Sequence, residues 1–191
     1  MTRKTRTAVY SGSFNPLHIG HLAIIRHLLE DAGFDMVRLI VSPKNPLKNG
    51  ISGGSGHERH AAALQAVKRR FPDNSRVYVD DIELNMPEPH YTIRTLDALS
   101  ERFPQESFTL TIGADNLADI RRWKAYARIL KTYGVAVYPR SGFDLEDIRK
   151  GLLDEDPEYK IQLLDAPVID ISSTYIRQLI SEGKEVSDLL M

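Results

Sequence analysis

The pattern of apolar and polar positions predicts short strands that alternate with helices. Residues 7–10 and 36–42 are almost continuously apolar over a strand's length, which is typical of strands buried in a parallel sheet. Between them, a helix over about residues 17–31 is indicated by apolar side chains that recur at helical spacing, namely Leu22, Ile25, Leu28 and Leu29.

The same alternation continues to the end of the chain. Further strands are expected at 76–84, 108–112, 134–138 and 160–164, and further helices at 57–70, 92–103, 116–121, 125–132, 143–153 and 173–182. Six such alternations without a repeat predict an α/β fold: a Rossmann-like, doubly wound, mostly parallel sheet with helices on both faces. We expect residues 1–191 to form a single domain.

The polar and glycine-rich stretches follow the expected strands. They lie at residues 11–21, 43–56, 85–92, 113–115 and 170–177. Because ligands of open parallel sheets bind beyond the carboxyl ends of the strands, we expect these stretches to meet at one site. The stretch 43–56, rich in glycine and proline, is interpreted as a mobile substrate loop or, alternatively, as a surface linker.

The composition of the chain excludes several kinds of binding partner and binding site. The formal net charge of −1 provides no general attraction to nucleic acid or to an anionic membrane, so neither is an expected partner. The chain has no cysteine, which excludes disulfides and thiolate metal sites. No secretory signal or membrane span is visible in the sequence, and a cytoplasmic location is therefore expected.

The stretch 10–24 reads as a strand, a turn and the start of a helix, an arrangement that binds anions at the free amides of the helix. Asn15 is the expected helix cap and Pro16 the expected first helical residue. His18 and His21, three residues apart, would share one face of that helix. Two unremarkable polar residues or a zinc pair are the alternatives, although a zinc pair lacks an obvious third ligand.

The two glycines of this stretch, Gly12 and Gly20, would leave room for a ligand to approach the backbone. A second candidate anion site lies at residues 172–177. Ser172, Ser173 and Thr174 are suited to cap a helix, and the helix dipole disfavours a cation as early in the helix as Arg177 unless an anion is bound. The alternative is a capped helix with an ordinary surface arginine.

These two stretches carry a family resemblance. Residues 12–21 resemble the G-x-F-x-P-x-H-x-G-H signature of the nucleotidylyltransferase superfamily, and residues 170–177 resemble its I-S-S-T-x-x-R signature. The branch of bacterial nicotinate-nucleotide adenylyltransferases is suggested by the loop 43–48, by Tyr91-Thr92, and by Gly113-Ala-Asp115 followed by Trp123. Leu47 stands where that branch usually has a histidine, which weakens the comparison at Lys48.

The resemblance implies that ATP and nicotinate mononucleotide are joined to give deamido-NAD and pyrophosphate, in NAD biosynthesis, by direct in-line attack on the α-phosphate. Mg²⁺ would arrive with ATP, and no residue of the protein is expected to be a metal ligand. His18, His21 and Arg177 would be catalytic. ATP would contact Gly12, Ser13, Phe14, Gly20, Gly113, Asp115, Ser173, Thr174 and Arg177. Nicotinate mononucleotide would contact Lys44, Asn45, Lys48, Tyr91, Thr92 and Trp123.

Several alternatives stay open at this point. Asp115 could simply cap a helix, and Trp123 could belong to the core. The substrate could be that of a pantetheine-phosphate adenylyltransferase or a cytidylyltransferase, and the chain could be an inactive nucleotide-binding regulator. A homo-oligomer is possible.

Overall fold

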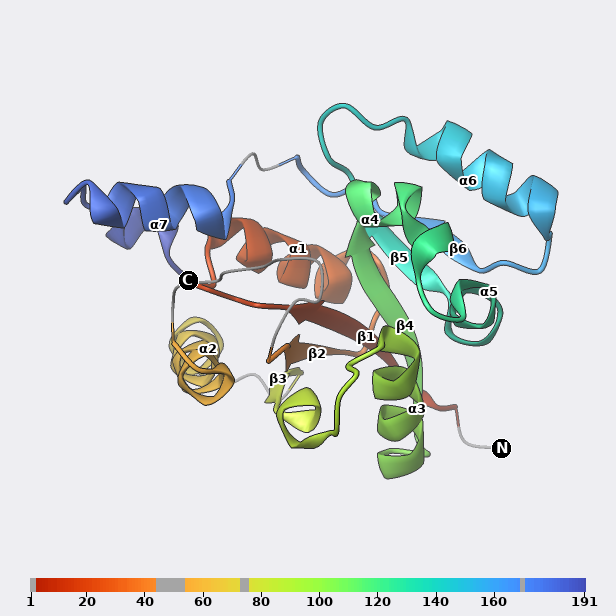
Figure 1. The fold of residues 1–191 in the computed structure, drawn as a ribbon, viewed down its shortest axis with the longest axis horizontal. Helices are drawn as coiled ribbons and strands as arrows, with labels where there is room; N and C mark the ends of the chain where they lie inside the picture. The colour runs from red at the N-terminus through yellow and green to blue at the C-terminus, as the bar shows by residue number, and fades with distance from the viewer. Residues whose placement is uncertain (1–2, 44–53, 73–75, 169–170) are drawn as a thin grey trace.

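The computed structural model describes residues 3–43, 54–72, 76–168 and 171–191. Its centre is a six-stranded sheet in the order β3-β2-β1-β4-β5-β6, in which every pairing between neighbouring strands is parallel (Figure 1). The strands are β1 (Thr5–Gly12), β2 (Met36–Val41), β3 (Val77–Asp80), β4 (Glu106–Gly113), β5 (Val135–Tyr138) and β6 (Ile161–Leu163). The order reverses between β1 and β4, as expected for a doubly wound sheet, so the predicted Rossmann-like fold is confirmed.

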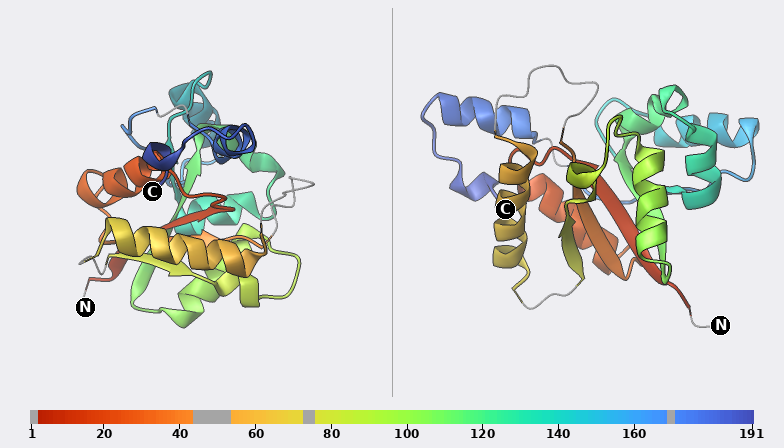
Figure 2. Two further views of the ribbon diagram at one scale, coloured as in Figure 1. Left: turned by 90° about the vertical axis from the view of Figure 1, so that its left-hand side faces the viewer. Right: turned by 60° about the horizontal axis from the view of Figure 1, so that its bottom comes forward.

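Helices cover both faces of the sheet (Figures 1 and 2). They are α1 (Ile19–Glu30), α2 (Gly56–Arg70), α3 (Thr92–Arg102), α4 (Ala114–Ala118), α5 (Tyr126–Arg128), α6 (Leu145–Glu155) and α7 (Ser173–Ser181). Successive side chains of a strand point to opposite faces, and β1 shows this directly. Ala8 and Tyr10 belong to the core beneath α1 and α2, whereas Val9 belongs to the core beneath α3 and α6.

Some predicted boundaries are wrong, and the differences have local causes. The helix expected from residue 17 begins at Ile19, because Asn15 and Pro16 lie in a turn and His18 is the cap. The strand expected at 76–84 ends at Asp80, whose carboxylate accepts a hydrogen bond from the Ile82 amide at 3.0 Å and starts a 3-10 turn, Ile82–Asn85.

The helix expected at 92–103 begins at Thr92 as predicted, with Tyr91 as its cap. One further expectation needed correction. The two helices expected at 116–121 and 125–132 are shorter and less regular: α4 and a 3-10 turn, then α5 and a π turn, Ile129–Tyr133.

The C-terminal segment returns to the start of α1. After α7, which projects at one end of the molecule (blue in Figure 1), Leu190 forms an antiparallel bridge with His18. The backbone N–H of Met191 donates to the Leu17 carbonyl, and its side chain is buried. In the part of the chain that the structure describes, no helix is long and apolar enough to cross a membrane.

Candidate active site

Two cavities meet at the carboxyl end of β1, where the strand order reverses. One, of about 370 Å³, is lined by both histidines and the start of α7, and we call it the histidine cavity. The other, of about 360 Å³, reaches Trp123 and the start of α3, and we call it the tryptophan cavity. Both are lined by Tyr10, Ser11, Gly12, Ser13, Asn116 and Tyr138. The end of β1 is therefore common to two adjoining spaces, each large enough for part of a nucleotide.

His18 and His21 lie in contact in the histidine cavity, with ring centroids 3.7 Å apart and ring planes inclined at 37°. The His18 backbone N–H donates to Nδ1 of His21 at 3.2 Å. Because that nitrogen is an acceptor, the proton of the neutral His21 ring is carried on Nε2. Nδ1 of His18 is buried and lacks a hydrogen bond of ordinary geometry in the described part of the chain, although the His18 side chain faces the backbone N–H of His21 in a capping box. The pair thus has unused polar capacity beside a cavity.

Both imidazoles are held neutral. Burial, with a smaller contribution from the nearby Arg140 guanidinium, lowers the pKa of His18 to about 4. Burial, then His18, then Arg140 lower the pKa of His21 well below its usual value. Burial also raises the pKa of Tyr10 at the end of β1. A neutral imidazole donates one hydrogen bond, so the histidines enter the site as donors without a charge.

The glycines of the first motif act differently from what the sequence predicts. A Cβ on Gly20 would lie 2.9 Å from Ile171 and 3.0 Å from the His18 ring, and a Cβ on Gly12 would lie 3.0 Å from the Phe14 ring. Side chains of the protein therefore occupy the places where a Cβ would project, while the backbone of both glycines lines the histidine cavity. Phe14 itself has a φ of 44°, a conformation that L-residues rarely adopt, and its ring is buried edge-on to His21. The glycines therefore position the rings that shape the cavity.

The second motif is tied directly to the first. Ser173 Oγ donates to the Pro16 carbonyl at 3.0 Å, and Arg177 Nη1 donates to the Asn15 carbonyl at 2.7 Å. Arg177 Nη2 also donates to Thr174 Oγ1 at 3.1 Å. Ser172 caps α7 by accepting a hydrogen bond from an amide of its first turn, as predicted. The start of α7 is therefore one wall of the histidine cavity.

Arg140 is a cavity residue that the sequence analysis missed. It follows β5, and its Nε lies 3.1 Å from Asp115 Oδ1, so the two residues form an ion pair across the histidine cavity. Both side chains are about half exposed. Gly113 adjoins this pair, since a Cβ there would meet Asp115 and Arg140. The signal that could have revealed Arg140 is its place directly after a predicted strand.

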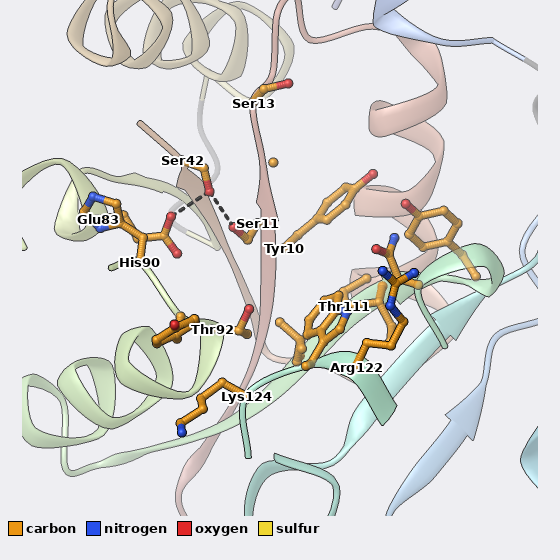
Figure 3. A pocket seen from close by; sticks show the side chains of 17 residues that line it. Tyr10, Ser11, Ser13, Ser42, Glu83, His90, Thr92, Thr111, Arg122 and Lys124 are labelled. Atoms are coloured by element: carbon orange, nitrogen blue, oxygen red, sulfur yellow. Dashed lines mark hydrogen bonds between the residues drawn. The ribbon is translucent and has the colours of Figure 1, made fainter. Parts of the chain in front are cut away.

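The tryptophan cavity brings together three of the predicted pyridine-nucleotide contacts, Tyr91, Thr92 and Trp123. Trp123 is half buried: it lines this cavity and also packs against the core beneath α3. Its neighbours in the chain, Arg122 and Lys124, also line this cavity, with side chains that point in different directions (Figure 3). This cavity combines a large ring, hydroxyl groups and cations, a mixture suited to a charged aromatic ligand.

Two buried charged residues at this end of the sheet were also missed. Arg59 donates to the backbone carbonyls of Ser13, Ser42 and Pro43 at 2.6 to 2.9 Å, and so holds the loops after β1 and β2 together. Glu83 is buried in the wall of the tryptophan cavity and accepts a hydrogen bond from Ser42 Oγ at 2.6 Å (Figure 3). Neither residue could be recognised from a short sequence motif, because the groups to which each is hydrogen-bonded lie in other elements of the fold.

Some predicted contacts fall elsewhere. Lys44, Asn45 and Lys48, and most of the loop 43–56, lie outside the described residues. Among the residues that the structure does describe, no group of three or more histidine or acidic side chains is placed to hold a metal ion. His18 and His21 thus have no third ligand of that kind in the described chain.

Comparisons with known proteins agree with this geometry. The profile of the cytidylyltransferase-like family matches residues 9–179. Proteins named probable nicotinate-nucleotide adenylyltransferase from Flavobacterium johnsoniae and Porphyromonas gingivalis are 38% and 41% identical to the chain. These alignments cover 97% of this chain and 91% of the first relative, and 94% and 86% for the second.

The fold is also that of a solved structure. A Plasmodium falciparum nicotinic acid mononucleotide adenylyltransferase, complexed with NaAD, superposes with a TM-score of 0.76 over 96% of this chain and 88% of that chain, at 19% sequence identity. At that identity the likeness concerns the fold alone, whereas the curated relatives share sequence over almost the whole chain. The chain therefore belongs to the cytidylyltransferase-like family and, within it, to the nicotinate-nucleotide adenylyltransferases.

Proposed function

We propose that the protein transfers the adenylyl group of ATP to nicotinate mononucleotide, giving deamido-NAD and pyrophosphate in NAD biosynthesis. The observation that carries this proposal is the meeting of two cavities at the end of β1, one beside the histidine pair and one beside Trp123. A transfer between two nucleotides needs two such spaces with a shared boundary, at which the reacting phosphates meet.

ATP would occupy the histidine cavity. Its β- and γ-phosphates would lie at the start of α7, near Ser173, Thr174 and Arg177, where free amides and a guanidinium favour anions. Asp115, beside Gly113, would accept hydrogen bonds from the ribose after releasing Arg140. Gly12, Ser13, Phe14 and Gly20 would shape the boundary between the two substrates.

Nicotinate mononucleotide would occupy the tryptophan cavity. Trp123 would stack on the pyridine ring, while Thr92 and the amides near Tyr91 would bind its carboxylate. Lys44, Asn45 and Lys48 belong to the same proposal. We also propose a single domain and a cytoplasmic location.

The reaction would be a direct displacement at the α-phosphorus. An oxygen of the nicotinate mononucleotide phosphate forms the new P–O bond, the bond to the bridging α–β oxygen breaks, and pyrophosphate leaves with that electron pair. His21, through Nε2–H, and His18 would donate hydrogen bonds to α-phosphate oxygens as negative charge builds there. Mg²⁺ would come bound to ATP as part of that substrate, because it is held largely by phosphate oxygens and water.

A substrate comparison tests the proposal. With MgATP, we expect deamido-NAD and pyrophosphate from nicotinate mononucleotide, and less product from nicotinamide mononucleotide. Pyrophosphate release with phosphopantetheine but not with nicotinate mononucleotide would contradict it, and ATP binding without turnover of either would indicate a regulator. Inversion of configuration at the α-phosphorus of a chiral ATPαS is the expected mark of direct attack, whereas retention would indicate a covalent intermediate.

A further inference from the structure

A chain of hydrogen bonds leads from a buried carboxylate to the wall of the tryptophan cavity. Glu83 is only 4% exposed. Its Oε2 accepts a hydrogen bond from Ser42 Oγ at 2.6 Å, and Ser42 Oγ lies 3.2 Å from Ser11 Oγ. Its Oε1 accepts a further hydrogen bond from Thr95 Oγ1 at 2.8 Å. Figure 3 shows Ser42 between Glu83 and Ser11, in the same wall.

The chemistry of these groups decides which one donates in each hydrogen bond. An ionised carboxylate only accepts hydrogen bonds, and a hydroxyl group has one proton to donate. Because Ser42 uses its proton on Glu83, the contact between Ser42 and Ser11 must be made with the proton of Ser11. Ser11 therefore presents lone pairs, and no proton, to a ligand in the cavity. A ligand group placed there has to be a donor.

We infer that Ser11, oriented by Ser42 and Glu83, accepts a hydrogen bond from a ribose hydroxyl of the pyridine mononucleotide, an inference that rests on the proposed function. The ionised phosphate and the carboxylate of nicotinate mononucleotide have no proton to donate, and its quaternary ring nitrogen has none either. The two ribose hydroxyls are its only donors.

The position of Ser11 agrees with this assignment. Ser11 lines both cavities, so it lies between the histidines, where the phosphate would react, and Trp123, where the ring would stack. The ribose connects those two ends of the substrate. Ser11 is then a contact for the substrate, whereas Ser42 and Glu83 are positioning residues that act through it. The two hydroxyls also keep the Glu83 carboxylate from facing the anionic groups of the substrate directly.

Steady-state kinetics with sugar-modified substrates test the inference. Ser11→Ala should raise the KM for nicotinate mononucleotide about three- to tenfold, the effect of one neutral hydrogen bond, with little change in the KM for ATP. The 2′-deoxy or the 3′-deoxy analogue should show a similar loss with the wild-type protein and no additional loss with Ser11→Ala. Such non-additivity is the sign of a direct contact.

The conservative variant Glu83→Gln distinguishes a role of Glu83 in orienting Ser11 from a role in protein stability alone. In Glu83→Gln the amide can donate to Ser42, so the Ser42 proton is free to be donated to Ser11. The direction of both hydrogen bonds is then reversed. We expect this variant to bind nicotinate mononucleotide as weakly as Ser11→Ala, although Ser11 is present. Ser107→Ala serves as the control with unchanged kinetics, because that hydroxyl donates to the Thr5 carbonyl at the amino end of β4, at the opposite end of the strand from the cavities.

Two results would overturn the inference. One is an equal penalty for the deoxy analogues in wild type and Ser11→Ala, and the other is an increase in the KM for ATP in place of that for nicotinate mononucleotide. Failure of the proposed function is a separate result, since the wild-type protein would then form no deamido-NAD at all, and the inference would fail with it.

Discussion

Arg177 Nη1 donates a hydrogen bond of 2.7 Å to the carbonyl oxygen of Asn15, a residue 162 positions earlier in the chain. This bond joins the start of α7 to the turn that precedes the two histidines. The guanidinium has five N–H donors, and its second bond in the structure goes to Thr174. Arg177 can therefore hold the turn with one edge while other donors remain for a phosphate.

Replacing Arg177 by lysine tests this double role. An ammonium keeps the charge but not the planar set of donors, so Arg177→Lys should raise the KM for ATP and lower turnover, together by about 10- to 100-fold in kcat/KM. The measurement is initial rates at varied ATP. Arg69→Ala, an exposed position at the end of α2, should behave as wild type, and a lysine variant with wild-type kinetics would contradict the role.

The donor role of His21 predicts a loss of turnover with the fold intact. His21→Ala should lower kcat by about 100-fold or more, the effect of removing one donor to a developing charge. His27→Ala in the same helix is the matched control, because His27 pairs with Asp31 away from both cavities. Circular dichroism should show native secondary structure for both variants. Near-normal turnover of His21→Ala would refute the mechanism.

Arg140 should control the titration of the histidines. Because its guanidinium lowers the pKa of both His18 and His21, Arg140→Ala should raise both pKa values. The rise should be partial, since burial is the larger cause. Proton NMR of the imidazole Cε1–H signals against pH measures it. Arg122→Ala, in the tryptophan cavity, is the comparison that should leave the two titrations in place.

The lowered pKa of His18 also predicts how stability depends on pH. Between pH 4 and 6.5 the unfolded chain binds a proton at this residue and the folded protein does not, so His18 lowers the free energy of unfolding as the pH falls through that window. His18→Asn should therefore gain stability relative to wild type at pH 5 compared with pH 7.5. Urea unfolding followed by the fluorescence of Trp123, the single tryptophan, measures both. An equal difference at the two pH values would contradict the assignment.

A buried ion-pair network beneath α3 should govern stability without taking part in the reaction. Arg38 bonds Glu106 through Nε at 3.0 Å and Asp80 through Nη1 at 3.3 Å, and all three are buried. Glu106→Ala leaves part of the Arg38 charge unpaired and should lower the free energy of unfolding by about 3 kcal/mol. The exposed Glu146→Gln should change it by less than about 0.5 kcal/mol. Both values come from urea unfolding, and kcat per folded molecule should stay unchanged.

The parts of the site that could be predicted from the sequence are those with local causes. The nearly continuous apolar runs at residues 7–10 and 36–42 give those two strands two buried faces, and the stripe of α1 follows from its own helical spacing. His18 and His21 were expected to share one face of a helix from their separation alone. Their ring centroids are indeed 3.7 Å apart, but His18 precedes the helix as its cap. The resemblance of residues 12–21 and 170–177 to known signatures then pointed to the family.

Predictions made from single residues failed where a distant partner decides the outcome. Asn15 and Pro16 suit the start of a helix, but their carbonyls accept hydrogen bonds from Arg177 and Ser173, and the helix starts later. The space expected at Gly20 is occupied by Ile171, from the other end of the chain. Local preferences of about 1 kcal/mol are overcome by such contacts.

The order of the elements, the doubly wound sheet and the family could be inferred from the amino-acid sequence, because these depend on periodicity and on short motifs. The ion pair of Arg140 with Asp115, the joining of two loops by Arg59, and the link from Glu83 through Ser42 to Ser11 are visible only in the folded chain. Each of these relationships joins residues from different strands or helices. Their energies depend on distances that exist only once the sheet has brought the carboxyl ends of its strands together.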